Sequence, residues 1–462
     1  MILTLALRSL LSHPIRSAVL AGGFGLGVAV MAALLGIGGV ILEQARAPEL
    51  EGGGDVVIGG ASGRVPNARF ILRHVLGSGP LAGRVAAAAP SARANLYLLD
   101  GRGAVAIPAR GSIPSFDRKM ADPEVAGIEV WRDTPADAAW ASPDDETLLR
   151  AMDRFHPIPD VPARAGSWLE WLYFNGRAGE ARFYLTFLAG PRVESGRRAF
   201  GVRLQLERGG RMRSYSESYE VGEEMLANAP NLSAGGNRVR LRGAGYAIGI
   251  DLPDESGGPR VTGWLTLAAP PGGSLPPFTI RGAGGWVSGY TVPVISGSLS
   301  GELRVGPDRI EFGGGTGYHD HNWGFWEGVR WQWGQVQGEP LSFVYGRVIP
   351  PADAADPSRL PGFLIALGPR GPIGYATDVA IREVDDPSTG RPRSITVTGE
   401  NESLALTLEI AVEETTATRM GEGAFGAGLD FLQMRATYRV TGRAGGGPVD
   451  FTATGSAETF RP

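Results

Sequence analysis

A short stretch in the middle of the chain gathers side chains that could do chemistry. Residues 315–324 read Gly-Thr-Gly-Tyr-His-Asp-His-Asn-Trp-Gly, with two of the five histidines of the chain on either side of one acid. In a β-strand, His319, His321 and Trp323 would point to one face. Asp320 and Asn322 would point to the other. Polar groups this dense beside tryptophans predict the wall of an apolar pocket with a few directing groups.

Two other interpretations of this motif stay open. One is a buried polar network without chemistry, pinning the junction of two barrels. The other is a metal site in which the two histidines share a cation and Glu311 or Glu327 completes the ligand set. Because no third histidine is near in sequence and the chain has no cysteine, we expect no metal. His13, His74 and His156 are isolated, and we assign them no role.

Composition excludes several other chemistries. With no cysteine among 462 residues, there is no disulfide, thiolate nucleophile or cysteine-bound zinc. Lys119 is the single lysine, which nearly excludes a Schiff-base or P-loop lysine. The net charge of −4 offers no basic field for phosphates, so we expect no nucleic-acid partner, and we expect no cofactor.

The motif also carries a family resemblance. Residues 318–324, Tyr-His-Asp-His-Asn-Trp-Gly, resemble the signature of the AttH-like family, which includes carotenoid 1,2-hydratases. Residues 168–176 are similar to the Trp-rich strand that opens the first domain of that family, and residues 290–294 are similar to a segment ahead of the main motif. The resemblance covers roughly residues 165–462 and implies two lipocalin-like β-barrels that bind a long apolar isoprenoid.

The hydratases of this family add water across a C=C bond. An acid protonates the alkene, aromatic faces stabilise the cation, and an activated water captures it. His321 and Trp323 match positions implicated there, but the expected Tyr-x-Asp pair reads Tyr345-Gly346-Arg347, with arginine where the acid should be. Asp320 could replace that acid only if burial raised its pKa well above about 4.

The resulting set of candidate residues has two parts. The catalytic candidates are His321, Asp320 and Tyr345. The ligand-binding candidates are His319, Trp323, Trp326, Trp331, Trp333, Tyr318, Trp171 and Tyr173.

Hydropathy patterns predict the elements that must position these residues. From Trp168 onward, period-two runs separated by Gly, Pro, Asn or Asp indicate antiparallel meanders that close into barrels or pack as sandwiches. Clear strand candidates are residues 182–187, 238–242, 394–398, 404–410, 435–440 and 449–454. We expect a mainly β protein with two lipocalin-like antiparallel β-barrels, residues 166–325 and 326–462.

A mixed α/β segment is expected ahead of the barrels, over residues 51–165. Short strands over 56–58, 96–99 and 105–107 alternate with Gly/Pro turns, and acidic residues at its start predict a helix over 144–155. Pro157, Pro159 and Pro162 then indicate a stiff linker, which we take as the domain boundary.

Residues 1–50 are expected to hold a single transmembrane helix. No residue from Ser17 to Leu42 is charged, a length that spans a bilayer core of ~30 Å. Arg8 and Arg16 precede the stretch and Glu43 follows it, so the positive-inside rule places the N-terminus in the cytoplasm. A cleaved signal peptide is the alternative. We expect a bacterial inner-membrane protein with its body in the periplasm.

The same N-terminal segment resembles the first helix of an FtsX/MacB-type ABC-transporter permease, through residues 5–11 and 53–58. This resemblance implies a possible permease partner. Three functions follow from the sequence: a membrane-tethered module that binds an isoprenoid or lipid, a hydratase or cyclase acting by acid catalysis, and a structural subunit of a transporter.

Overall fold

The computed structural model describes residues 15, 58–59, 65, 68–72, 83–100, 103–120, 132–141, 143–270, 272–360, 362–368, 371–420 and 429–461. The chain divides into two compact units, residues 1–68 with 86–141 and residues 69–85 with 142–462. The expected transmembrane helix, residues 17–42, lies outside the described residues. Within the described part, no helix has the length and apolar character needed to cross a membrane.

The first unit is built around one antiparallel hairpin. Strand β1 (Ser91–Asp100) pairs with β2 (Gly103–Ser112) from Ser91 opposite Ser112 to Asp100 opposite Gly103. The strands expected over 96–99 and 105–107 are therefore confirmed and are longer than predicted. The described short helices after this hairpin are α4 (Pro114–Met120) and α5 (Pro135–Ala141). Helix α3 (Ala68–Phe70) lies at the division between the two units.

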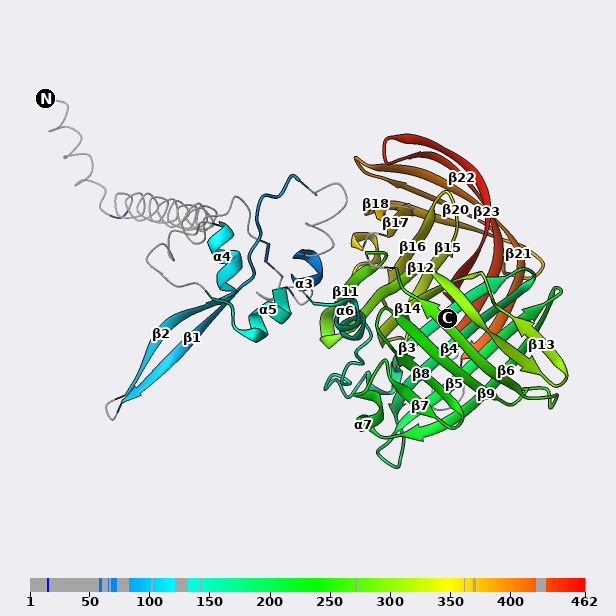
Figure 1. Ribbon diagram of the computed structural model, residues 1–462, viewed down its shortest axis with the longest axis horizontal. Helices are drawn as coiled ribbons and strands as arrows, with labels where there is room; N and C mark the ends of the chain where they lie inside the picture. Colours follow the sequence, from blue (N-terminus) through cyan, green and yellow to red (C-terminus); the bar gives the residue numbers. More distant parts are fainter. Residues whose placement is uncertain are drawn as a thin grey trace, which may run out of the picture. The chain divides into compact units, whose positions relative to one another are not determined.

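The second unit is mainly β and contains two large antiparallel sheets that curve into nearly closed barrels (Figure 1). The first sheet runs β6-β5-β4-β3-β14-β12-β10-β9-β8-β7, with β11 and β13 pairing with β12. Its strands are β3 (Trp168–Ala178), β4 (Ala181–Arg192), β5 (Arg198–Arg208), β6 (Arg211–Val221), β7 (Leu232–Ala234), β8 (Asn237–Leu241), β9 (Gly245–Leu252), β10 (Val261–Ala268), β11 (Leu275–Arg281), β12 (Val287–Val305), β13 (Asp308–Glu311) and β14 (Gly315–Phe325).

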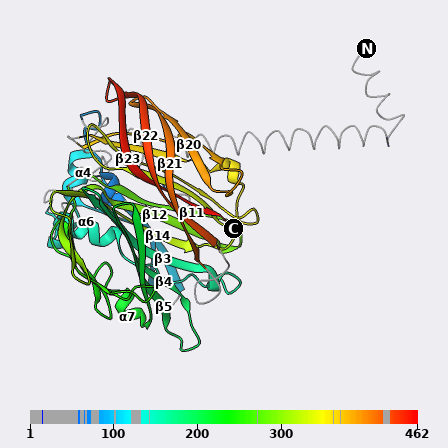
Figure 2. The same cartoon turned by 90° about the vertical axis from the view of Figure 1, so that its right-hand side faces the viewer.

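The second barrel follows directly. Its sheet runs β18-β17-β16-β15-β23-β22-β21-β20-β19 and lies against the first barrel in both views (Figure 1, Figure 2). Its strands are β15 (Arg330–Val336), β16 (Ser342–Ile349), β17 (Phe363–Gly368), β18 (Gly371–Ala376), β19 (Asp378–Asp385), β20 (Pro392–Glu400), β21 (Leu404–Met420), β22 (Leu429–Ala444) and β23 (Gly447–Arg461). Five of the six strand candidates named from the sequence lie within strands of these two sheets, and the sixth, 238–242, extends one residue beyond β8.

Helices play a small part in this unit. The helix expected over 144–155 is present as α6 (Asp145–Met152), and the Asp144 carboxylate caps it by accepting a hydrogen bond from the Thr147 N–H at 2.7 Å. The remaining helical turns are η4 (Ala165–Ser167), α7 (Glu223–Leu226), η5 (Ala283–Gly285) and η6 (Pro357–Arg359). The unit that contains the barrels includes all residues from 142 to 462, so it also contains the Pro-rich segment.

Three apolar clusters form the core. One lies within the first barrel and includes Leu172, Phe174 and Leu185, and another lies within the second and includes Val397, Leu408 and Val440. The third is the most aromatic and joins strands of both barrels, through Trp168, Trp171, Tyr173, Tyr290, Trp323, Trp326, Trp331, Trp333, Phe363 and Phe460. The chain therefore buries most of its tryptophans where the two barrels meet.

Candidate functional site

The histidine motif forms β14, and its side chains alternate between two faces as its sequence predicts. Residues opposite each other on neighbouring antiparallel strands share a face, so the register identifies the neighbours of each group. His319 lies opposite Phe174 and His321 opposite Leu172, which places both imidazoles on the core side of the first barrel. Asp320 lies opposite Tyr173 and Asn322 opposite Trp171, on the face toward the second barrel.

On the core side, His319 is fully buried and all its hydrogen-bonding capacity is used. Its Nδ1 donates to the Tyr173 carbonyl at 2.9 Å, and its Nε2 lies 3.1 Å from both oxygens of Asp153. The Tyr246 hydroxyl donates to the same carboxylate at 2.6 Å. The ring of Phe174 stacks on the imidazole with centroids 4.0 Å apart. These contacts tie the segment after α6 to the interior of the barrel.

His321 belongs to a second buried network centred on Glu170 of β3. Its Nδ1 lies 2.9 Å from the Met152 carbonyl, and its Nε2 lies 3.0 Å from Glu170 Oε1. His156 donates its backbone N–H to the same carboxylate at 2.9 Å and places its ring Nδ1 2.8 Å from Oε1. His156 is therefore not isolated, and the expectation that it has no role is wrong.

In this network, Glu170 and His321 each shift the pKa of the other toward its charged form. Burial by itself lowers the pKa of His321, but the hydrogen bond and charge of Glu170 outweigh it and raise that pKa above its usual 6.5. Burial likewise raises the pKa of Glu170, and its hydrogen bonds with His156 and His321 outweigh this, so that its pKa falls below the usual 4.5. Since both nitrogens of His321 face acceptors, the pair is an imidazolium and a carboxylate.

A metal ion could be held here. Among the described residues, His156, Glu170 and His321 offer one ligand atom each, and these atoms lie within 4.8 Å of one another. His156 Nδ1 and His321 Nε2 already contact Glu170 Oε1, so these ligand atoms have partners without an ion. The expectation that Glu311 or Glu327 would complete a ligand set is wrong, because both are exposed. The acids beside the histidines are Asp153 and Glu170.

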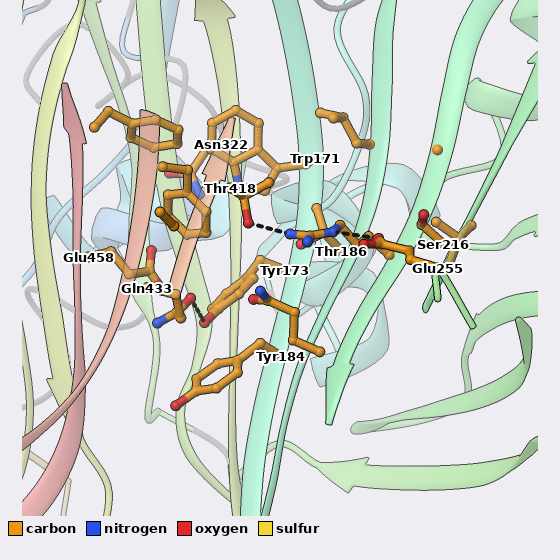
Figure 3. Close-up of a pocket in the computed structure, with 18 of the residues that line it drawn as sticks. Trp171, Tyr173, Tyr184, Thr186, Ser216, Glu255, Asn322, Thr418, Gln433 and Glu458 are labelled. Atoms are coloured by element: carbon orange, nitrogen blue, oxygen red, sulfur yellow. Dashed lines mark hydrogen bonds and ion pairs between the residues drawn. The ribbon is translucent and has the colours of Figure 1, made fainter. Parts of the chain in front are cut away.

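The opposite face of β14 lines a cavity of about 470 Å³ between the barrels (Figure 3). One wall comes from β3, β4, β5, β6 and β14, and the other from β15, β21, β22 and β23. Figure 3 shows Tyr173, Tyr184, Gln433 and Glu458 on one side of this space, and Ser216 and Glu255 on the other. The apolar lining residues are Trp171, Leu188, Val202, Trp331, Phe431 and Phe460.

Two buried acids lie at this face. Burial, together with the nearby charge of Glu458, raises the pKa of Asp320 well above its usual 3.8, and Asn322 donates a hydrogen bond to Asp320 Oδ1 at 2.6 Å. Burial also raises the pKa of Glu458 to about 7. Asp320 therefore meets the condition that the sequence analysis set for an acid. Glu458, rather than Asp320, lines the cavity.

The predicted ligand-binding residues divide between the cavity and the packed core. Trp171, Tyr173 and Trp331 line the cavity. The others pack beside or behind it: Trp333 donates from Nε1 to the Tyr318 hydroxyl at 2.8 Å, Trp326 donates to the Leu169 carbonyl at 3.0 Å, Trp323 stacks on His156 at 4.3 Å, and His319 lies in the barrel core.

The three predicted catalytic residues do not come together. His321 faces the core of the first barrel, and Asp320 faces the inter-barrel side of the same strand. Tyr345 lies in the core cluster of the second barrel, where its ring covers Gly334 of the neighbouring strand. The structure therefore does not bring Tyr345 and His321 together in one site.

Sequence reasoning missed five groups of the site: Asp153, His156, Glu170, Gln433 and Glu458. Glu170 carried a usable signal, because a lone acid among apolar residues in a strand predicts a buried, paired carboxylate. The other four approach β14 or the cavity from distant parts of the chain, which no local pattern reveals.

The comparisons with known proteins concern the fold. The structure is similar to the crystal structure of CghA, with a TM-score of 0.45 and 12% identity over 64% of this chain and 88% of that one. It is also similar to a protein described as AttH from Nitrosomonas europaea, with a TM-score of 0.40 and 15% identity over 63% of this chain and 91% of that one. The resemblance of residues 5–11 and 53–58 to a permease gains no support from them. Neither a protein-family model nor a curated protein matches the sequence.

Proposed function

We propose that the protein binds an apolar small molecule, an isoprenoid or a lipid, in the cavity between its two barrels. The observation that carries the proposal is the cavity itself. Its volume of about 470 Å³ falls within the range of small-molecule sites, and aromatic side chains from both barrels line it together with polar and charged ones such as Arg203, Glu255 and Glu458. Trp171 of the first barrel and Phe460 of the second lie with ring centroids 6.2 Å apart.

A variant that fills the cavity tests this proposal. Thr186 lines the space and is half-buried, so Thr186→Trp should abolish binding of an apolar fluorescent probe while the chain stays folded. Thr407→Trp is the matched control, because Thr407 is also a half-buried strand threonine but lies outside the lining. Equal probe binding by the wild type and both variants would rule out this cavity as the site.

Acid catalysis is the second candidate function, and the two buried acids favour it. A protonated Glu458 would transfer its proton to a C=C bond of the bound ligand, leaving a carboxylate and a cation stabilised by the faces of Trp171 and Trp331. Water would then attack the cation and return a proton to the carboxylate. The sequence resemblance to hydratases implies the same reaction.

Product analysis separates the two candidates. The full chain is incubated with the alkene farnesene, and alcohol products are measured by mass spectrometry. If the protein is an enzyme, Glu458→Gln should keep ligand binding and lose turnover. Binding with no product at any pH between about 5 and about 8, where the acid changes from neutral to charged, would leave the binding function alone.

We also propose that residues 17–42 anchor the protein in the bacterial inner membrane, with its body in the periplasm and a permease as a partner. The uncharged run and the flanking charges support the anchor. Protease added to intact spheroplasts should digest the body of the full chain, and co-purification should recover the permease. A protected body would contradict this orientation.

A further inference from the structure

The inter-barrel cavity has an apolar end and a polar end. On the second barrel, Phe431 lies opposite Phe460, and two residues along the strands Gln433 lies opposite Glu458. All four line the cavity. The pair of aromatic rings is therefore followed by a pair of polar groups on the same face.

The wall from the first barrel changes in the same way. Trp171 lies opposite Leu188, and two residues along the strands Tyr173 lies opposite Thr186. Tyr184 then lies opposite Gln205 on the next pair of strands. The wall passes from an apolar pair to hydroxyl and amide groups.

The two walls are aligned. Trp171 contacts Phe460 at the apolar end, with ring centroids 6.2 Å apart. The Tyr173 hydroxyl donates to Gln433 Oε1 at 3.1 Å at the polar end (Figure 3). Matching ends face each other, so the cavity as a whole is amphiphilic.

The polar end has unused hydrogen-bonding capacity. Gln205, Gln433 and Glu458 are each at most 6% exposed. Among the described residues, Gln205 Nε2, Gln433 Nε2 and Glu458 Oε1 have no hydrogen-bond partner. Buried polar atoms without partners cost free energy and call for an explanation. Two amide donors and one acceptor oxygen at this end of the cavity match a ligand that both accepts and donates hydrogen bonds.

We infer that the ligand is an amphiphile whose apolar skeleton packs between Trp171 and Phe460 and whose hydroxyl or carbonyl oxygen lies at the Gln433–Glu458 end. The inference rests on the proposed binding function and narrows it: a pure hydrocarbon would leave the polar end unsatisfied. An oxygen at this end would accept from the Gln433 amide, and a hydroxyl would also donate to Glu458.

Two probes with the same fifteen-carbon skeleton test this inference. Farnesol carries a hydroxyl at one end and farnesene carries none, and calorimetric titration of the full chain gives both affinities. We expect farnesol to bind at least about tenfold more tightly, the effect of one well-formed hydrogen bond. Equal affinities would overturn the inference and leave the binding function standing. Binding of neither probe would overturn both.

Substitutions in the cavity wall show which residues produce the preference for farnesol over farnesene. Gln433→Leu keeps side-chain size and removes the amide, so the farnesol preference should fall to less than about threefold while farnesene binding is kept. Gln205→Leu tests the same end from the other barrel, so the result does not depend on the folding of one variant. Gln335→Leu is the matched control, because Gln335 is fully buried with unpartnered amide atoms but lies outside the lining. A preference unchanged in both wall variants would overturn the inference.

Discussion

At the scale of single residues, the molecule contains two kinds of buried ionisable group. Glu170 and His321 stabilise each other as an ion pair on the core side of β14. Asp320 and Glu458 lie at the inter-barrel side, where burial favours their neutral forms. One strand thus separates charged groups that hold the fold together from neutral acids beside a cavity.

The ion pair predicts a large cost for removing one partner. Glu170→Gln leaves a buried imidazolium without its carboxylate, which should lower the free energy of unfolding by roughly 3–5 kcal/mol in urea titrations. The exposed pair of Arg439 and Asp450 is the control, and Asp450→Asn should cost less than about 1 kcal/mol. If Glu170→Gln lowers the free energy of unfolding no more than the control does, the Glu170–His321 pair contributes little to stability.

The neutral acids predict a stability that falls as pH rises. The pKa of Glu458 is about 7 in the folded chain and near 4.5 in the unfolded chain, so the folded chain holds its proton more tightly, and stability is lost as pH rises between these values. Asp320 and His321, whose pKa values are also raised, act in the same direction. The pKa of Glu170 is lowered instead, so its contribution to stability is present at neutral pH and is lost as pH falls into the acid range.

Urea unfolding at about pH 5.5 and about pH 8 should therefore show a more stable protein at the lower pH. Glu458→Gln, which cannot ionise, should flatten this dependence by on the order of 2 kcal/mol, because only the part of the pKa difference above about pH 5.5 falls within this interval. A wild-type stability that rises over this interval, or a Glu458→Gln variant with an unchanged slope, would contradict the assignment of raised pKa values.

At the scale of elements, the segment after α6 is part of the first barrel. The Asp153 carboxylate forms hydrogen bonds with His319 and Tyr246. The ring centroids of Phe155 and His321 lie 5.3 Å apart. Pro157 and its neighbours suit an extended spacer, and a linker is predicted there. The residues just before those prolines fill the barrel interior.

Phe155→Ala should accordingly destabilise the protein by about 3 kcal/mol, because Phe155 is only 7% exposed. Phe278 is 46% exposed, and Phe278→Ala should cost clearly less. Thermal melts of the two variants compare them directly. If both variants lose the same amount of thermal stability, the segment after α6 does not pack inside the first barrel.

The elements also show how far sequence reasoning reaches. Alternation over residues 435–440 was enough to predict a strand there. For residues 315–324, a strand was an assumption, and the period of two then separates His321 from Asp320 by face. Which face would line a cavity was not predictable, since that depends on where the second barrel packs. Gln433 looked like an ordinary strand residue, and its partner Tyr173 lies 260 positions away in the chain.

At the scale of the whole molecule, the two barrels share a core. The aromatic cluster between them joins Trp171 to Phe460, and polar contacts across the same region join Arg435 to Glu207 and Arg177 to the Thr454 carbonyl. Such an interface buries residues of both barrels and should couple their unfolding.

Hydrogen exchange at increasing denaturant tests this coupling. Amides of β12 in the first barrel and of β22 in the second should lose protection with one common midpoint. Loss of protection in β22 at clearly lower denaturant would show that the second barrel unfolds alone.

The most direct test of the account is to locate the ligand. A farnesol analogue that carries a photoreactive diazirine in its chain is bound to the full protein, irradiated, and mapped by peptide mass spectrometry. We predict labelled peptides from both walls, from β3 or β4 in the first barrel and from β22 or β23 in the second, and loss of both in Thr186→Trp. Labelling confined to one barrel, or unchanged in Thr186→Trp, would contradict a binding site between the barrels.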